Sequence, residues 1–204
     1  RRSSDLGSWT IIAGIGGSVT AASSPTSGFT GVAGTTYTLR WTIANAPCVA
    51  STDDVVITLT ANPTVSVAGT DLNICGTSTT LAGNTPVIGS GSWTIESGVG
   101  GVLGDASSPT SSFSGAVGVI YTLRWTISNA PCVGSTDEVL VSFSAAPSVA
   151  DAGVDKTACL SPARATMTAA VPAVGSGVWS QVSGPVFANI ISPNAPNTII
   201  TGLN

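Results

Sequence analysis

The sequence contains no histidine, a single lysine (Lys156) and few charged residues of either sign. Charged residues make up 8% of the chain, against about 25% in ordinary globular proteins. Six basic and ten acidic residues give a formal net charge of -4. This balance excludes nucleic-acid binding through clustered Lys and Arg, and it excludes attachment to an anionic membrane through a polybasic segment.

Long apolar runs are also missing. The longest aliphatic runs, such as Val55–Ile57, are far shorter than the roughly 20 residues that a membrane-spanning helix needs, so no membrane insertion is expected. Disorder is excluded in turn, because 43% of the 204 residues are hydrophobic and the five tryptophans among them can bury a core. What remains is a chain rich in Ser, Thr, Gly and Val, a composition that favours β-structure.

Catalytic constellations are absent as well. Without histidine there is no Ser-His or Cys-His pair, and no glycine-rich phosphate loop stands between a strand and a helix. The glycines of Gly14–Gly17 lie in a β context and are interpreted as a turn. We therefore expect a protein that is not an enzyme and has no cofactor.

Internal repetition is the strongest positive signal. The run Tyr37–Ile43 returns unchanged as Tyr121–Ile127, 84 residues later. Aligned without gaps at that offset, residues 7–62 and 91–146 share 34 identities in 56 positions. A third, more diverged copy follows. Repeats of this kind predict an array of similar domains.

Strict alternation of apolar and polar residues predicts the strands. Residues 121–127 place two aromatic and two aliphatic side chains on one face, and residues 139–143 alternate in the same way. Val65 and Val67 are expected to open the unit. About seven short strands in each repeat, separated by Gly and Pro turns, predict an all-β chain of tandem immunoglobulin-like (PKD-like) β-sandwich repeats with a period of about 84 residues.

Within this fold, the tryptophans are expected in the core rather than on a sugar-binding surface, because they lie on the apolar faces of their strands. Arg1–Leu6 matches no other copy. The chain is expected to be an excerpt of a longer array. The expected domains are 1–62, a repeat truncated at its N-terminal side; 63–146, a complete repeat; and 147–204, a repeat truncated at its C-terminal side.

The ordered landmarks of the repeat resemble the PKD/Ig-like tandem repeats of Bacteroidota cell-surface adhesins that are secreted by the type IX route, a class that includes gliding-motility adhesins. The landmarks are Ala68–Asp71, Cys75, Gly91–Trp93, Tyr121–Ile127, Cys132 and Ser135–Asp137. The resemblance implies an extracellular, cell-surface location. It also implies a role as a structural spacer or filament segment, with neighbouring repeats of the same chain, or other surface or filament proteins, as partners.

A second hypothesis is a glycan- or protein-binding module. In that case the loops at 96–106 and 112–120, which vary between the copies, would carry the ligand. An extended spacer with a surface of Ser, Thr and Gly is favoured, because binding hot spots are enriched in Tyr, Trp and Arg.

Acidic residues at matching places in the repeats are weak candidates for a calcium site, since Ca²⁺ takes carboxylate and carbonyl oxygens. The favoured interpretation is structural, with Asp side chains bonded to nearby backbone in turns. The candidates are Asp53, Asp54, Asp71, Asp137, Glu138 and Asp155.

The four cysteines predict disulfides in an exported array. Cys75 and Cys132 are the preferred pair, inside the complete unit, which leaves Cys48 and Cys159 with partners outside these residues. The alternative is a bond across the junction between units, because a regular sandwich would place Cys75 and Cys132 at opposite ends, too far apart to be joined.

Overall fold

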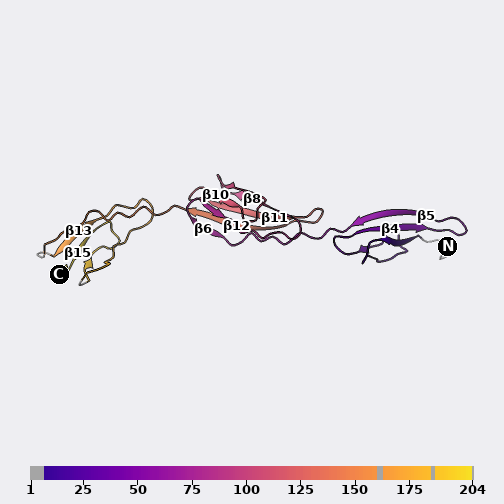
Figure 1. The fold of residues 1–204 in the computed structure, drawn as a ribbon, viewed down its shortest axis with the longest axis horizontal. Helices are drawn as coiled ribbons and strands as arrows, with labels where there is room; N and C mark the ends of the chain where they lie inside the picture. The colour runs from indigo at the N-terminus through magenta and orange to yellow at the C-terminus, as the bar shows by residue number, and fades with distance from the viewer. Residues whose placement is uncertain (1–6, 160–162, 185–186, 204) are drawn as a thin grey trace.

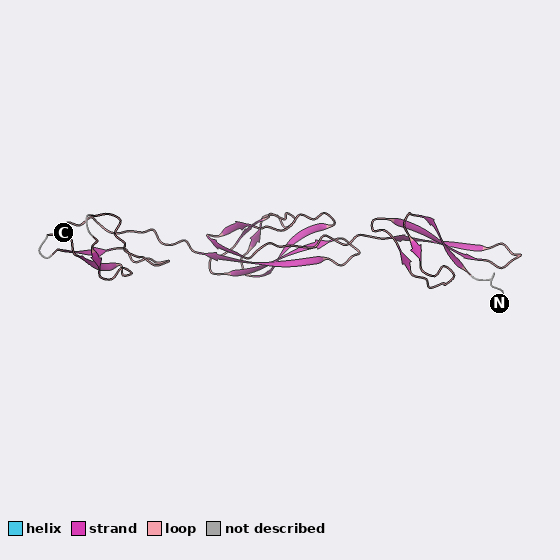
Figure 2. Ribbon diagram, turned by 90° about the horizontal axis from the view of Figure 1, so that it is seen from below, coloured by secondary structure: helices cyan, strands magenta, loops and turns pink. Residues whose placement is uncertain are grey.

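The computed structural model describes residues 7–159, 163–184 and 187–203, and all the regular structure in these ranges is β. The strands form three groups that follow one another along a line (Figure 1), and a view turned by 90° shows the same row (Figure 2). We call the groups the first unit (β1–β5), the second unit (β6–β12) and the third unit (β13–β15). In these described ranges no helix is long and apolar enough to cross a membrane.

The second unit consists of two facing sheets. Its seven strands are β6 (Leu72–Cys75), β7 (Ser78–Thr80), β8 (Ser90–Ser97), β9 (Val102–Leu103), β10 (Ser112–Ser114), β11 (Ile120–Ser128) and β12 (Ser135–Ser144). One sheet has the order β6-β12-β11-β8 and the other the order β7-β10-β9. All neighbours are antiparallel except β6, which pairs in parallel with β12.

The core of the second unit lies between these sheets. The five side chains that the alternation most clearly places inside are all buried, as predicted: Trp93, Leu123, Trp125, Val139 and Val141. Phe113 of the opposite sheet stacks on Phe143 and packs edge-on against Tyr121. Alternation in β11 and β12 thus gives each strand one apolar face, and these faces meet in a single cluster.

Tyr121 has a further role at the start of β11. Its hydroxyl accepts a hydrogen bond from the Ala116 backbone N–H (2.8 Å) and donates one to the Val99 carbonyl (3.1 Å). This is the tyrosine corner of immunoglobulin-like domains, and Trp93 occupies the core position expected for a tryptophan on the third strand of that fold. The second unit is an immunoglobulin-like β-sandwich.

The opening of this unit differs from the prediction. Residues 63–71 lie outside regular strands, Val65 and Val67 are 73% and 50% exposed, and the first strand is β6. The small residues that alternate with the valines, Ser66 and Ala68, are the buried ones. The valines were therefore expected on the wrong face of this segment. The space beside β12 holds only small side chains, the hydroxymethyl group of Ser66 and the methyl group of Ala68.

The first unit repeats part of this arrangement with β1 (Ser8–Ala13), β2 (Ser18–Val19), β3 (Phe29–Thr30), β4 (Thr36–Ile43) and β5 (Ser51–Thr58). Its sheet β1-β4-β5 corresponds to β8-β11-β12, and its pair β2-β3 to β9-β10. Tyr37 forms the same corner, to Val32 and Ile15. Among residues 7–62, no strand stands in the places that β6 and β7 take in the second unit.

The third unit contains β13 (Arg164–Thr168), β14 (Asn189–Ile190) and β15 (Asn197–Thr201) in the order β13-β15-β14, which corresponds to β7-β10-β9. Trp179 donates its indole N–H to the Ala195 carbonyl (3.1 Å), much as Trp93 does to Ser108 (3.1 Å). The domain limits at 62/63 and 146/147 stay predictions.

Candidate functional site

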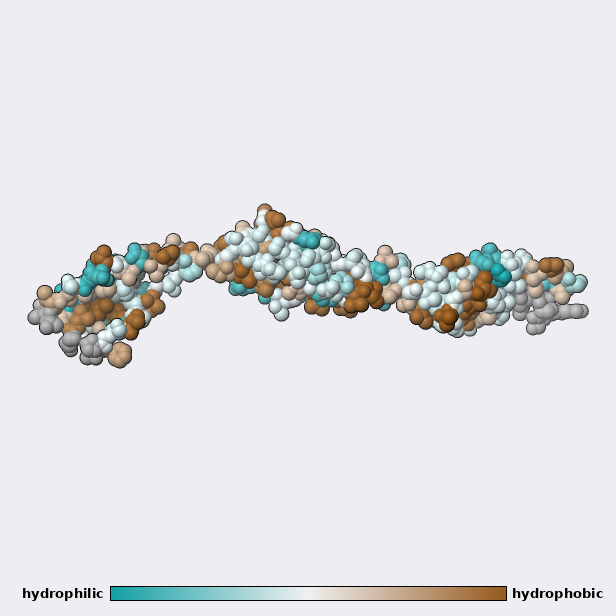
Figure 3. Space-filling model, in the orientation of Figure 1, coloured by the Kyte–Doolittle hydropathy of each residue, from teal (hydrophilic) through white to brown (hydrophobic). Residues whose placement is uncertain are grey.

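The first unit presents an uncovered part of its core along β5. Ile43 is 53% exposed, whereas Ile127, at the same place in the second unit, is fully buried. Val55 is 42% exposed, whereas the matching Val139 is 2% exposed. Hydrophobic surface is visible on this unit in Figure 3. Since the sequences of β4 and β5 are close copies of β11 and β12, the difference in burial comes from what covers them.

In the second unit the cover is the segment 63–84. Strand β6 pairs with the outer edge of β12, and Leu72 and Ile74 pack against the core. Farther along, Asn84 accepts a hydrogen bond from the Trp125 indole N–H through its backbone carbonyl (3.2 Å). The β5 edge of the first unit is therefore the surface that a segment of this kind covers in the second.

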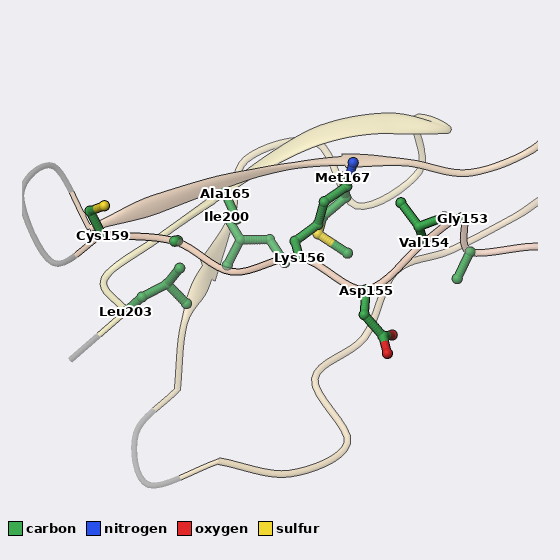
Figure 4. Close-up of a pocket in the computed structure, with 11 residues that line it drawn as sticks. Gly153, Val154, Asp155, Lys156, Cys159, Ala165, Met167, Ile200 and Leu203 are labelled. Atoms are coloured by element: carbon green, nitrogen blue, oxygen red, sulfur yellow. The ribbon is translucent and has the colours of Figure 1, made fainter.

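The third unit has the complementary feature, two cavities of about 400 and 510 Å³. In the first, Met167 and Ile200 occupy the places of the buried Leu81 and Phe113 of the second unit. Figure 4 shows Asp155 directing its carboxylate away from these side chains. Trp179 lines the second cavity. Both cavities lie where the second unit holds core side chains of β11 and β12, so we interpret them as open core rather than as ligand pockets.

The junction between the first and second units is closed by direct contacts. Asn129, in the loop between β11 and β12, donates its side-chain N–H to the Ala61 carbonyl (2.8 Å). In the same loop the Cys132 Sγ lies 3.5 Å from the Thr60 carbonyl oxygen. A hairpin loop of the second unit is thus held against the last residues of the first.

The cysteine pairing preferred from the sequence is not formed, since Cys75 and Cys132 are both free thiols. The sheet register gives the reason. Cys75 lies beside Ser144 at one end of β12, and Cys132 precedes Ser135 at the other end. Nine residues of strand at about 3.3 Å each separate these ends by about 30 Å, far beyond the roughly 7 Å between Cα atoms that a disulfide allows. Cys48 and Cys159 are exposed and free.

The acidic candidates do not gather at one place. Asp54 accepts two hydrogen bonds from the Arg40 guanidinium (2.8 and 2.9 Å). These bonds, and to a smaller degree the charge of Arg40, hold the pKa of the Asp54 carboxyl below its usual range. Arg124 donates two hydrogen bonds to one carboxylate oxygen of Glu138 (3.0 and 2.6 Å) and also contacts Glu96. The bonding to Glu138 raises the pKa of Arg124.

Two other acids fasten the opening segment of the second unit. The Asp137 carboxylate accepts the Ala68 backbone N–H (2.7 Å), and the Asp71 carboxylate accepts the Leu140 backbone N–H (2.9 Å). Asp53 and Asp155 are exposed. Across the described part of the chain, no three Asp, Glu or Cys side chains gather closely enough to hold a metal ion.

The two loop regions of the binding-module hypothesis lie near the Tyr121 corner. Val99, in the first region, is 90% exposed and bonded to the Tyr121 hydroxyl through its carbonyl. In the second region Phe113 is part of the core.

The sequence carried no signal for three long-range hydrogen bonds: those that the Asp71 and Asp137 carboxylates accept and the one that Asn129 donates to Ala61. Each of them joins residues at least 68 positions apart, so no local pattern could have predicted it.

No protein-family model and no curated protein sequence matches the chain. Solved structures with some likeness include a mouse cadherin-23 fragment, EC22-24 (12% identity, TM-score 0.31, 76% of this chain and 59% of that one). Protocadherin gamma B2 domains 3-6 match at 12% identity, with a TM-score of 0.35 over 96% of this chain and 58% of that one. The insect immune protein hemolin matches at 12% identity, with a TM-score of 0.35 over 98% and 61%.

The chain thus spans less than two thirds of the length of each of these structures. The first two are cadherin fragments and the third is an insect immune protein whose description refers to homophilic adhesion, and TM-scores this low support no argument about function. The assignment of the fold rests on the sheet order and the tyrosine corner of the second unit.

Proposed function

We propose that this chain is a non-enzymatic structural spacer, a filament segment of a long secreted cell-surface adhesin. The proposal includes export by the type IX route and an extracellular location, as in the Bacteroidota adhesins whose repeats the sequence resembles. The observation that carries it is the end-to-end row of three related β units in Figures 1 and 2, the second of which is a complete β-sandwich. A row of domains fixes the distance between the segments attached to its two ends.

The junction supports this role. The connection from β5 to the second unit is short and contains Pro63, which restricts bending. The bond from Asn129 to Ala61 ties the hairpin loop of one unit to the end of the preceding one. Because neighbouring repeats contact each other directly, the principal partner of each unit is the next unit of the same chain.

The surface supports it as well. Few charges are present, and both arginines of β4 and β11 are paired with acids, Arg40 with Asp54 and Arg124 with Glu138 and Glu96. The outward residues of these strands are mainly Ser and Thr. Such a surface is polar but creates no strong electrostatic field. This suits a segment that spaces other domains apart rather than one that binds a charged partner.

Small-angle X-ray scattering of the full chain tests the proposal. Three units in a row, each given the length of about 35 Å that the ten-residue strand β12 sets for the second unit, have a radius of gyration of about 30 Å. A compact globule of this length would give about 17 Å. A value near the compact one would contradict the spacer role.

A junction variant makes the test sharper. Asn129→Ala removes the bond to Ala61, so it should lower the radius of gyration by letting the first two units bend. Asn45→Ala is the matched control, because Asn45 has the same place in the first unit and is exposed in the loop between β4 and β5. Equal effects of the two substitutions would show that this contact does not stiffen the row.

A further inference from the structure

We propose that the second unit resists a pulling force along the row, and that this resistance lies in the contact between its opening segment, residues 63–76, and β12. The inference rests on the proposed spacer role and deepens it. A spacer sets a distance, whereas a unit of this kind also transmits tension between the segments attached to the two ends of the row.

The path of the chain decides how a pull acts on this unit. The chain enters from the first unit at Pro63 and leaves toward the third unit after Ser144, at the opposite end of the second unit (Figure 1). Ser66 lies beside Ser135 at the start of β12, and Cys75 lies beside Ser144 at its end. A pull on the row therefore draws the opening segment toward the first unit and β12 toward the third.

The direction of strand pairing turns this pull into sliding. Among the strands of residues 63–146, all of which the structure describes, β6 and β12 form the one parallel pair. Hydrogen bonds between strands run across the strands, so two neighbours that slide past each other stretch all their bonds at the same time. In an antiparallel pair the two pulled ends would lie side by side, and the bonds would break one after another.

Side-chain bonds extend the contact beyond the short strand β6. Ser66 exchanges two hydrogen bonds with Ser135 (2.9 and 2.6 Å). The Asp137 carboxylate accepts the Ala68 backbone N–H (2.7 Å), and a bond to a carboxylate is roughly twice as strong as one between neutral groups. The segment is thus already held along β12 before the two strands begin to pair.

The bonds continue to the end of β12. The Asp71 carboxylate accepts the Leu140 backbone N–H (2.9 Å). Along β6 the two strands pair directly, and the Gly76 N–H then donates to the Ser144 carbonyl (2.9 Å). Residues 66–76 are therefore bonded to β12 from its first residue to its last, and a pull is shared over the whole length of the strand.

This contact is also the one that yields first. Strand β12 is an inner strand of its sheet and pairs with β11 from Ser135 to Ser142, whereas β6 is an edge strand. On its other side the opening segment is held by Asn84, whose side chain donates to the Val65 carbonyl (2.9 Å) and accepts the Val67 N–H (2.8 Å). The opening segment is thus held less extensively than β12, so its bonds set the force at which the unit unfolds.

Single-molecule force spectroscopy tests the inference on the full chain, held at its two ends through peptide tags. Unfolding of the second unit releases residues 63–144. The expected gain in length is about 250 Å, since an extended chain spans about 3.5 Å per residue and the folded unit already spans about 35 Å. At constant force, Asp137→Ala should raise the unfolding rate of this unit about tenfold or more, because it removes a charged hydrogen bond that breaks on the way to the transition state.

Two control variants separate resistance to force from stability. Tyr121→Phe removes the two hydrogen bonds of the corner, which lie outside the contact. Because the corner is still intact when the contact yields, the unfolding rate under force should change by about twofold or less, even where urea unfolding shows a loss of stability. Glu138→Ala removes the neighbouring carboxylate of β12, which bonds Arg124, and should also leave this rate nearly unchanged.

Asp71→Ala gives a second test of the contact, since it removes an exposed hydrogen bond and does not depend on how well the Asp137 variant folds. It should speed unfolding under force several-fold. Equal acceleration by Tyr121→Phe and by the two contact variants, or no acceleration by Asp71→Ala, would overturn the inference. Scattering without force separates it from the spacer role: a compact chain contradicts the spacer role, whereas an extended chain whose unfolding under force is insensitive to the contact contradicts this inference alone.

Discussion

Trp93 and Trp125 face each other across β8 and β11 with their ring centroids 5.0 Å apart. Trp9 and Trp41 repeat this pair in the first unit at the same separation. The burial differs, because Trp93 and Trp125 are buried whereas Trp9 and Trp41 are only half-buried. The segment 63–84, which covers the second pair, makes the difference.

Replacing Trp125 by alanine should therefore cost far more than replacing Trp41. We expect Trp125→Ala to lower the free energy of unfolding of the second unit by about 3–5 kcal/mol, since it empties a fully buried site. Trp41→Ala should lower that of the first unit by about half as much, because part of its ring is already in water. Hydrogen exchange read separately over 36–58 and 120–144 measures both effects. Equal losses would show that the two pairs are covered to the same extent.

The Tyr121 hydroxyl should stabilise the second unit through its two backbone partners. Tyr121→Phe keeps the ring but leaves the Ala116 N–H and the Val99 carbonyl without this partner, so we expect a loss of about 1–3 kcal/mol. Urea unfolding followed by tryptophan fluorescence measures it. Ser97→Ala, which removes an exposed hydrogen bond to Thr122, is the control and should change stability by at most about 0.5 kcal/mol. A loss no larger than that of the control would argue against the corner.

Asp54 should titrate at a lower pH than an isolated carboxyl, because Arg40 holds its pKa below the usual range. With the folded-state pKa lowered, the stabilisation is fully present above the unfolded-state pKa, about 4, and is lost as the pH falls through the lowered folded-state value. Arg40→Gln should move the pKa of Asp54 up toward its ordinary value. Carboxyl-resolved NMR titration measures the shift, and Arg124→Gln, in the other unit, should leave Asp54 unchanged. An Asp54 pKa that does not respond to Arg40→Gln would contradict the pairing.

Much of the fold follows from local pattern. The alternation in 121–127 and 139–143 identifies two long strands and their buried faces, because successive side chains of a strand point to opposite sides. The opening of the unit was predicted in the wrong phase at Val65 and Val67, since small residues rather than large ones face the core there. Strand β6 was missed because Leu72–Cys75 is short and is held mainly by its parallel partner β12.

The sequence alone determined the repeat, the all-β class and the apolar faces of β11 and β12, all of which depend on residue types at short spacing. Only the tertiary structure decided which repeats are covered and where the cysteines lie. Ile43 and Ile127 stand in identical local sequences, yet Ile43 is half exposed and Ile127 is buried. The difference comes from the segment 63–84, which is distant from Ile127 in sequence and covers the core of the second unit. Cys75 and Cys132 lie at opposite ends of the sandwich because β6 runs parallel to β12, a direction set by long-range pairing that no local spacing encodes.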